Sequence, residues 1–264
     1  MNASLITSVL IPAQMDDSLR ESLFAIFSDH YEQVDRATFE SDLQDKDHLL
    51  LLTDALTGAP CGFSTQRVIP LTTVGGSVRF LFSGDTIIRR ENWGSQALAR
   101  AWGEYAGARL AEAPETPLYW FLISKGFRTY RYLPVFFHEY FPRAGIVTPT
   151  PQQALLDQIA QRLFAPHYDS GRGLVIHPQS RGQLIPELAV IPAGREQDPD
   201  TRFFLKKNPG AVRGDELACL ARIHPDNFKP LGRRWVEAGL TAARVSDWVR
   251  EPRLDPHATA ADLT

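Results

Sequence analysis

Residues 78–97 read VRFLFSGDTIIRRENWGSQA, and this stretch decides the fold. In Val78–Ile88, side chains alternate along an apolar run up to a polar break at Ser83-Gly84-Asp85, which is typical of a strand with a bulge at the glycine. From Gly94 onward, apolar residues such as Leu98 recur at helical spacing. The stretch therefore predicts a strand that runs through a turn at Trp93-Gly94 into a helix.

Strands and helices are also predicted on the N-terminal side of this stretch. Leu49–Leu52 and Cys61–Ile69 flank the turn residues of Asp54–Pro60 and predict an antiparallel hairpin. A loop at Pro70–Gly76 then leads into Val78–Ile88, which becomes a third antiparallel strand. A first strand at Ala3–Ile11 and helices after Asp16 and at Arg36–Leu43 precede them.

On the C-terminal side, the helix is expected to end before Pro114, and the apolar run Leu118–Ile123 predicts a buried strand. Because a helical crossover joins this run to Val78–Ile88, the two strands are expected to be parallel neighbours. Ser124–Phe137 is expected to be helical up to Leu133, since a residue before proline disfavours the helix. The order is strand, helix, helix, three strands, helix, strand.

The remaining chain divides by composition. Gln152–Phe164 predicts a helix, and Ala165–Pro199 is rich in proline, glycine and polar residues, which indicates an irregular insertion. Arg202–Lys206 and Glu216–Ile223 are interpreted as a hairpin. We therefore divide the chain into a core at 1–145, a helix and irregular insertion at 146–201, a hairpin completing the sheet plus a helix at 202–240, and a tail at 241–264.

Composition narrows the function classes. With 264 residues, 44% hydrophobic, 22% charged and a net charge of -3, the chain is expected to be globular, without the basic stripe that nucleic acid requires. Cys61 and Cys219 have no disulfide or zinc spacing, so no metal site is expected. No stretch approaches the ~20 apolar residues of a membrane span, and Met1–Pro12 has no basic region of a signal peptide. We expect a cytoplasmic protein.

The order of elements resembles the GNAT-like (acyl-CoA N-acyltransferase) fold from Ser4 to about Pro142. The resemblance implies an α/β (α+β) fold, with a mixed central sheet flanked by helices and here a C-terminal extension. In that family the last antiparallel strand diverges from its parallel neighbour, and the pantetheine arm of a thioester donor lies in the opening. The resemblance places Phe82, Ser83 and Ser124 beside this arm.

The family also binds the donor's pyrophosphate at a turn of pattern Arg/Gln-x-x-Gly-x-Gly/Ala that opens a helix, where unpaired N–H groups attract anions. The corresponding residues here are Arg89-Arg90-Glu91-Asn92-Trp93-Gly94-Ser95-Gln96-Ala97, and the resemblance implies donor binding by Arg89, Arg90, Trp93, Gly94 and Ser95. Glu91 replaces the usual Arg or Gln, and Gln96 replaces a small residue. The departures leave open an acyl carrier protein, whose phosphopantetheine has no nucleotide, and an ordinary strand-to-helix turn.

Candidate catalytic residues follow from the same resemblance. A tyrosine about seven residues after the parallel strand often protonates the leaving thiolate, and Tyr130 and Tyr132 bracket that position, with Tyr132 preferred. Core aromatics with bonded hydroxyls are the alternative. Asp85, Glu91 and His138 are candidates for the general base, although Asp85 also fits a solvated bulge residue.

Ten aromatic residues between Tyr119 and Phe141 predict an apolar wall for a medium or long acyl chain, or else an aromatic core cluster. They are Tyr119, Trp120, Phe121, Phe127, Tyr130, Tyr132, Phe136, Phe137, Tyr140 and Phe141. Interleaved Lys125, Arg128, Arg131 and Arg143 indicate a basic rim.

The leading hypothesis is an acyltransferase that moves an acyl group from acyl-CoA or an acyl carrier protein to a small-molecule amine. No tightly bound cofactor is expected. The chain is expected to be a monomer or a homodimer. Neither cysteine has the local context of a nucleophile, which favours direct attack by the amine. The alternatives are a non-catalytic protein that binds an acyl-thioester or lipid, and a thioesterase in which Asp85 or His138 activates water.

Overall fold

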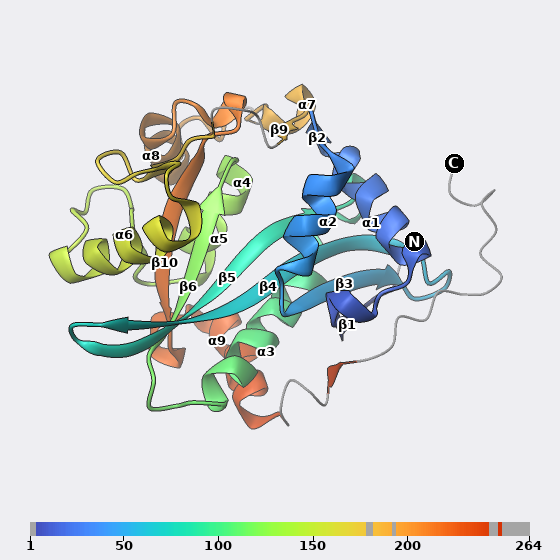
Figure 1. Ribbon diagram of the computed structural model, residues 1–264, viewed down its shortest axis with the longest axis horizontal. Coiled ribbons are helices and arrows are strands. Elements are labelled where there is room, and N and C mark those ends of the chain that lie inside the picture. The colour runs from blue at the N-terminus through green and yellow to red at the C-terminus, as the bar shows by residue number, and fades with distance from the viewer. Residues whose placement is uncertain (1–3, 178–181, 192–193, 243–247, 250–264) are drawn as a thin grey trace.

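The computed structural model describes all residues except 1–3, 178–181, 192–193, 243–247 and 250–264 (Figure 1). Within the described residues, eight strands form one sheet in the order β1-β3-β4-β5-β6-β10-β8-β7, and β2 pairs with β9. The strands are β1 (Leu5–Leu10), β2 (Tyr31–Glu32), β3 (His48–Asp54), β4 (Pro60–Thr73), β5 (Gly76–Ile88), β6 (Leu118–Ser124), β7 (Tyr168–Asp169), β8 (Leu174–Val175), β9 (Gln183–Leu184) and β10 (Glu216–Ile223). The helices are α1 (Asp17–Ser28), α2 (Arg36–Gln44), α3 (Ala97–Ala111), α4 (Phe127–Tyr130), α5 (Tyr132–Phe136), α6 (Thr150–Phe164), α7 (Pro186–Ala189), α8 (Pro199–Lys207) and α9 (Pro230–Thr241).

The expected order of elements is confirmed from β1 to β6. β1, β3, β4 and β5 are successive antiparallel neighbours in the sheet. The loop predicted at Pro70–Gly76 is wrong, because β4 continues to Thr73 and the turn lies at its end. β3 pairs with β4 only as far as Gln66, so one edge of β4 is unpaired at Pro70. Proline has no N–H group, and at an unpaired edge this removes no hydrogen bond of the sheet. β4 and β5 form the long hairpin at the left of Figure 1.

β5 and β6 are parallel, as expected, but only over part of their length. Arg79–Ser83 pairs with Leu118–Leu122, and beyond this point β5 pairs only with β4. β6 pairs with β10 along its whole length, and at its end, where Ile123 and Ser124 lie opposite Ala218 and Leu217, β10 is its only partner among the described strands. The two central strands therefore diverge after Ser83.

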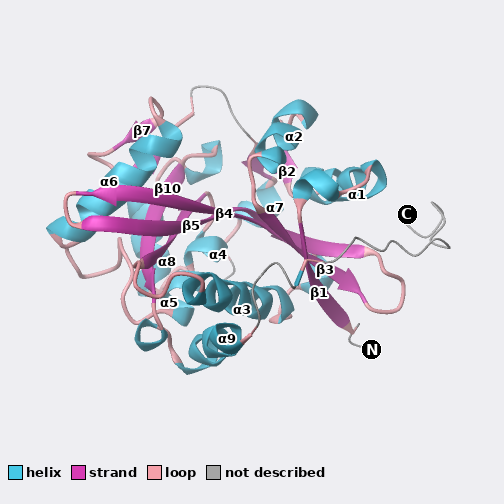
Figure 2. Cartoon of the chain, turned by 60° about the horizontal axis from the view of Figure 1, so that its bottom comes forward, coloured by secondary structure: helices cyan, strands magenta, loops and turns pink. Residues whose placement is uncertain are grey.

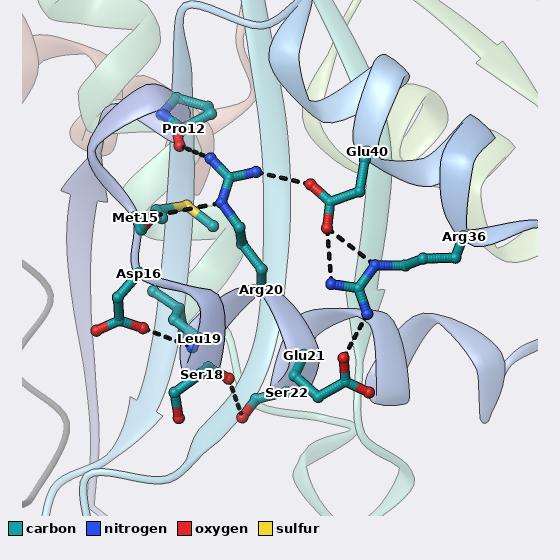
Figure 3. A network of polar contacts seen from close by, with 10 residues as sticks. All are labelled: Pro12, Met15, Asp16, Ser18, Leu19, Arg20, Glu21, Ser22, Arg36 and Glu40. Atoms are coloured by element: carbon teal, nitrogen blue, oxygen red, sulfur yellow. Dashed lines mark hydrogen bonds and ion pairs between the residues drawn. The ribbon is translucent and has the colours of Figure 1, made fainter.

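Helices cover both faces of the sheet. Buried side chains of α1 and α2 pack on β1, β3 and β4, and α6 packs on the same face over β5, β6 and β10. On the opposite face, α3 and α9 lie side by side (Figure 2). In Figure 3, an ion-pair network joins α1 to α2, with Glu40 accepting from Arg20 at 2.7 Å and from Arg36 at 2.8 Å. This network fixes α2 beside the diverging strands.

Helices α3 and α9 approach so closely that glycine is required in both. A Cβ atom at Gly107 would lie 2.1 Å from the Val236 carbonyl oxygen, and one at Gly239 would lie 1.9 Å from the Glu104 carbonyl oxygen. Helix α9 was expected only as an unspecified helix after the hairpin. Its packing brings Trp235 to the base of the diverging strands.

The predicted hairpin at Arg202–Ile223 is wrong, because Arg202–Lys206 lies in helix α8. Asp198 accepts the Thr201 N–H at 2.9 Å as the N-cap, and Pro199 begins the helix, a start signal that the interpretation as a strand overlooked. Only Glu216–Ile223 is a strand, and it completes the sheet by pairing antiparallel with β6. The insertion adds β8 and β7 beyond β10. The predicted tail lies largely outside the described residues.

Two helix boundaries also differ from the expectation. Helix α3 begins at Ala97 rather than at Gly94, because Gly94 has a φ of +93° and interrupts the helical backbone after a 3-10 helix at Arg90–Asn92. The aromatic segment contains two short helices, and α5 includes Pro134, which lies in the first turn where no N–H group is needed.

Candidate active site at the divergence of β5 and β6

The bulge in β5 reverses which face of the sheet each side chain reaches. The register between β4 and β5 shifts between the pairs Ser64–Thr86 and Gln66–Ser83. Before the bulge, Ser83 faces α3 and accepts a hydrogen bond from Trp102 Nε1 at 3.1 Å. Two residues later, Asp85 lines a cavity on the α2 side. Between these two pairs β5 has one residue more than β4. This extra residue gives β5 polar side chains on both faces of the sheet at the bulge.

Two neighbouring side chains leave little room for a Cβ atom at Gly84. A Cβ atom there would lie 2.6 Å from Thr65 Oγ1 and 3.0 Å from Lys46 Cε. Both distances are shorter than ordinary van der Waals contact, so the Thr65 hydroxyl and the end of the Lys46 side chain would have to shift to make room for a side chain here.

The described residues form three cavities that adjoin the opening. The basic cavity, of about 630 Å³, lies between the end of β5, the turn before α3, and α4. The described residues that line it include Lys125, Arg128, Arg131 and Arg195 and no carboxylate. Across its mouth the Arg128 guanidinium stacks on the Trp93 ring, 4.7 Å from the centroid. This cavity suits an anionic ligand.

The apolar cavity, of about 50 Å³, lies on the α3 and α9 face. Its lining includes the rings of Trp102, Trp120, Tyr132, Phe136, Phe228 and Trp235. Three of the ten aromatic residues singled out in the sequence therefore contribute to this wall. A void of this size accommodates a group of a few atoms with the side chains in their present positions.

The acidic cavity, of about 390 Å³, lies on the α2 and α6 face. Five carboxylates line it, together with three cations and two histidines. The carboxylates are Asp35, Asp42, Asp45, Asp85 and Glu216; the other charged or titratable residues are Lys46, Arg67, Lys125, His167 and His177. Its excess of carboxylates favours a cationic ligand such as a protonated amine.

The three cavities meet at one place. Thr86 and Thr129 line all of them, from β5 and α4 on the two sides of the opening. A ligand at this junction has access to an anion-binding arm, an apolar arm and an arm lined by carboxylates.

Asp85 is half-buried in the acidic cavity, and burial raises the pKa of its carboxyl group above the ordinary value. The positive charges of Lys125 and then Lys46 oppose this increase, and the Asp42 charge adds to it. A carboxylate with a raised pKa is a stronger base, so Asp85 is suited to accept a proton from an amine.

The two tyrosine candidates differ in their surroundings. Tyr132 lines both the basic and apolar cavities, and its hydroxyl has no hydrogen-bond partner among the described residues. Burial raises its pKa. Tyr130 is fully buried, packs 5.5 Å from Phe204, and donates to the Pro142 carbonyl oxygen at 2.9 Å. The geometry favours Tyr132 over Tyr130 as a group that reaches a ligand.

The turn after β5 separates into two sets of residues. Trp93, Gly94 and Ser95 line the basic cavity. The Trp93 indole donates to the Ile88 carbonyl oxygen at 2.9 Å, which fixes the ring under Arg128.

The other residues of this turn lie elsewhere. Arg89 points back to α1, where it lies 3.5 Å from Asp29, and donates to the Pro60 carbonyl oxygen at 3.2 Å. Arg90 and Glu91 are exposed in the 3-10 helix and line none of the three cavities.

The other candidates are placed as follows. Phe82 lines the acidic cavity, and Ser83 lines the apolar cavity. Ser124 is buried and donates to the Gly126 carbonyl oxygen at 2.8 Å, so its hydroxyl stabilises the loop before α4. His138 is exposed and lines none of these cavities. The structure therefore brings together Phe82, Ser83, Asp85, Trp93, Gly94, Ser95 and Tyr132, but not Arg89, Arg90, Glu91, Ser124, Tyr130 or His138.

Several residues at the opening were not predicted. Thr86 and Thr129 have no motif context, and Lys46 comes from the segment after α2. One signal was present in the sequence, because Ser64-Thr65-Gln66 places three polar residues in succession within a strand, so that both of its faces carry polar groups there, and all three are buried.

Both cysteines are free and buried. Burial raises the pKa of the Cys219 thiol and that of the Cys61 thiol. Within the part of the chain that the structure describes, no cluster of three or more histidine, cysteine or acidic residues has the arrangement of a metal site. No described helix is both long and apolar enough to cross a membrane.

The strand order, the parallel pair that diverges beyond a bulge, and the helix that crosses between its strands define a GNAT-like fold, as the sequence resemblance implied. Solved structures that match this chain in part include a GNAT family N-acetyltransferase from Escherichia coli in complex with CoA. It matches with a TM-score of 0.36 and 17% identity over 50% of this chain and 69% of its own.

A probable N-acyltransferase from Enterococcus faecalis has a TM-score of 0.38 and 12% identity over 60% of this chain and 44% of its own. An acetyltransferase from Trypanosoma brucei has a TM-score of 0.34 and 17% identity over 54% of this chain and all of its own. No protein-family model and no curated protein matches the chain. Because these TM-scores are below 0.5, the likenesses carry no argument, and the fold assignment rests on the strand order and on the divergence of β5 and β6.

Proposed function

We propose that the protein is an N-acyltransferase that moves an acyl group from a phosphopantetheine thioester directly to an amine. The observation that carries this proposal is the junction of three cavities at Thr86 and Thr129. Acyl transfer brings together three groups at one carbon, namely the thiol arm of the donor, the acyl chain and the nucleophile. The basic, apolar and acidic cavities match these groups in charge and polarity.

In this mechanism the bound amine first loses one proton to solvent and attacks in its neutral form, and Asp85, on the acidic side, accepts the second proton as the C–N bond forms. The carbonyl π electrons move onto oxygen and then return as the C–S bond breaks. Tyr132, on the donor side, gives its proton to the departing thiolate. Each general acid or base contributes about 10²- to 10⁴-fold to a rate of this kind.

For the donor, acyl-CoA is the primary proposal and an acyl carrier protein is the alternative. The cations of the basic cavity support a phosphate-bearing ligand in both cases. Carrier-protein binding has an additional feature in its favour, because Leu205 and Val212 line the cavity mouth and are exposed by 40% and 66%. Apolar side chains within a basic rim suit an acidic partner helix. Comparing acetyl-CoA with acetyl-phosphopantetheine on a carrier protein distinguishes these donors.

For the acyl group, the volume of about 50 Å³ supports a short chain such as acetyl or propionyl. The medium or long chain inferred from aromatic density requires rings such as Trp102 and Trp235 to move. A series of acyl-CoA donors from two to twelve carbons measures this directly. The cytoplasm is the proposed location, because free Cys61 and Cys219 fit a reducing compartment.

The central test is thiol release from acetyl-CoA in the presence of a panel of primary amines, followed by mass spectrometry of the amide. Asp85→Asn is expected to lower kcat by roughly 100-fold. Asp29→Asn, an exposed carboxylate on the other side of Arg89, serves as the matched control and is expected to leave the rate unchanged.

Each alternative function gives a different result in the same assay. Thiol release that does not depend on amine supports a thioesterase, and saturable binding of acetyl-CoA without thiol release supports a non-catalytic protein. Either result contradicts the proposed transfer. Full activity of Asp85→Asn with every accepted amine contradicts the role of Asp85.

A further inference from the structure

A buried chain of hydrogen bonds runs behind the junction of the cavities. Ser83 Oγ lies 3.1 Å from Trp102 Nε1 and 2.9 Å from Trp120 Nε1. An indole N–H group only donates, so both lone pairs of the serine hydroxyl are occupied. Its single proton therefore goes to Gln66 Oε1, which lies 2.8 Å away.

This first link fixes the direction of the next ones. Because the amide oxygen of Gln66 accepts from Ser83, its Nε2 group faces Ser64 and donates to Ser64 Oγ at 2.7 Å. Ser64 Oγ then lies 2.7 Å from Thr86 Oγ1. Both Gln66 and Ser64 are buried, with exposed fractions of 0% and 2%.

The proton of the Ser64 hydroxyl has one acceptor among the described residues, which is Thr86 Oγ1. A buried hydroxyl proton without an acceptor costs about 1–3 kcal/mol, so Ser64 donates to Thr86. Thr86 therefore receives a hydrogen bond from behind, and its own proton is directed away from Ser64. Since Thr86 lines all three cavities, that proton is available to a ligand where they meet.

We propose that Thr86 Oγ1 is a catalytic hydrogen-bond donor to the carbonyl oxygen of the bound thioester. This inference rests on the proposed acyl transfer. When the amine nitrogen bonds to the carbonyl carbon, the π electrons move onto oxygen, and the Thr86 proton stabilises the oxyanion through a hydrogen bond without being transferred. The oxyanion then re-forms the carbonyl group and expels the thiolate.

The hydrogen-bond chain orients this donor before the substrate binds. A β-branched side chain has few χ1 rotamers, and the bond from Ser64 fixes the acceptor side of the hydroxyl. A donor that is already aimed requires little reorganisation as negative charge develops. Trp102 and Trp120, which donate to the first serine of this series of hydrogen bonds, therefore influence the reaction indirectly. Their effect passes through Ser83, Gln66 and Ser64.

The test compares Thr86→Val, which keeps the shape and removes the hydroxyl, with Thr86→Ser, which keeps the hydroxyl. Thr86→Val is expected to lower kcat by roughly 100-fold at an unchanged Kd for acetyl-CoA, because one oxyanion donor contributes about 10²- to 10³-fold. Thr86→Ser is expected to remain within a few-fold of the wild type. Thr72→Val, at an exposed position of the β4–β5 hairpin, is the control for the substitution itself.

A second readout does not require turnover. The infrared carbonyl band of bound acetyl-CoA labelled with ¹³C at the thioester carbonyl is expected at lower frequency in the wild type than in Thr86→Val. An unchanged band in a variant that binds acetyl-CoA, or a kcat within threefold of the wild type, overturns the inference and leaves the acyl transfer standing. A wild-type protein that does not bind acetyl-CoA overturns the proposed donor and the inference together.

Discussion

Replacing Gly239 with alanine is expected to separate α3 from α9. The added Cβ atom would lie 1.9 Å from the Glu104 carbonyl oxygen, 2.7 Å from its carbon and 3.0 Å from the Ala108 nitrogen. All three atoms belong to the backbone of α3, so no side-chain rotation relieves the contact. The helices must move apart by about 1.1 Å before the shortest distance reaches the 3.0 Å limit of real Cβ contacts.

The free energy of this change has two opposing parts. Overpacking of this kind destabilises by about 1–3 kcal/mol and occasionally more, and a gap of 0.5–1 Å forfeits about a quarter to a half of each dispersion contact. Alanine returns up to about 1 kcal/mol through its higher helix propensity. We expect a net loss of about 2 kcal/mol, or a fall in Tm of about 4–8 °C for a chain of this size.

Urea unfolding of both proteins provides the measurement, with the midpoint expected to fall at an unchanged m value. Gly75→Ala is the matched control, because its Cβ atom meets only Thr73 Oγ1 at 3.7 Å, and it is expected to stay within about 0.5 kcal/mol of the wild type. A Gly239→Ala protein as stable as the wild type refutes the close helix contact. Because α9 carries Trp235, weaker binding of acyl donors is expected to accompany the loss of stability.

The remaining predictions concern the opening itself. Asp85→Asn is expected to raise the free energy of unfolding at neutral pH, because the folded state raises the pKa of the carboxyl group and so disfavours its charged form. This gain in stability is complete above the raised pKa and disappears below the unfolded pKa near 3.8. Urea midpoints measured as a function of pH test it. Lys46→Met removes a charge that lowers the pKa of Asp85, so the acid limb of kcat/KM is expected to move to higher pH, while Lys46→Arg leaves it in place. Gly84→Ala is expected to cost about 1–3 kcal/mol and reduce turnover, as parallel unfolding and rate measurements would show. Joint replacement of Cys61 and Cys219 by alanine is expected to leave kcat unchanged. Loss of turnover in this variant would indicate a covalent acyl-enzyme.

The sequence predicted those parts of the fold that depend on local pattern. The break at Ser83-Gly84-Asp85 marked the bulge because glycine and polar residues interrupt an apolar run. The interpretation of Arg202–Lys206 as a strand was wrong because five residues are too few to distinguish the helical repeat of apolar residues from the strand repeat. The N-cap at Asp198 lies before the segment that was considered.

The candidate site was harder to predict because its residues come from separate elements. The resemblance pointed to Trp93 and Tyr132, which line the cavities, whereas Lys46 and Thr86 have no local signature of a site. The direction in which a side chain points also cannot be read from spacing. Arg89 turns toward Asp29 and Tyr130 toward Pro142, away from the cavities that their positions in the resemblance implied.

One inserted residue at Gly84 allows a single strand to serve two partners independently. Without it, the alternation of β5 would turn Asp85 toward α3, and all residues from there to Ile88 would exchange faces. With it, side chains on one face can diversify to suit a new amine while those on the other keep the same thioester. A change of acceptor during evolution or engineering can therefore be confined to α2, α6 and the residues facing them, without redesign of the donor side.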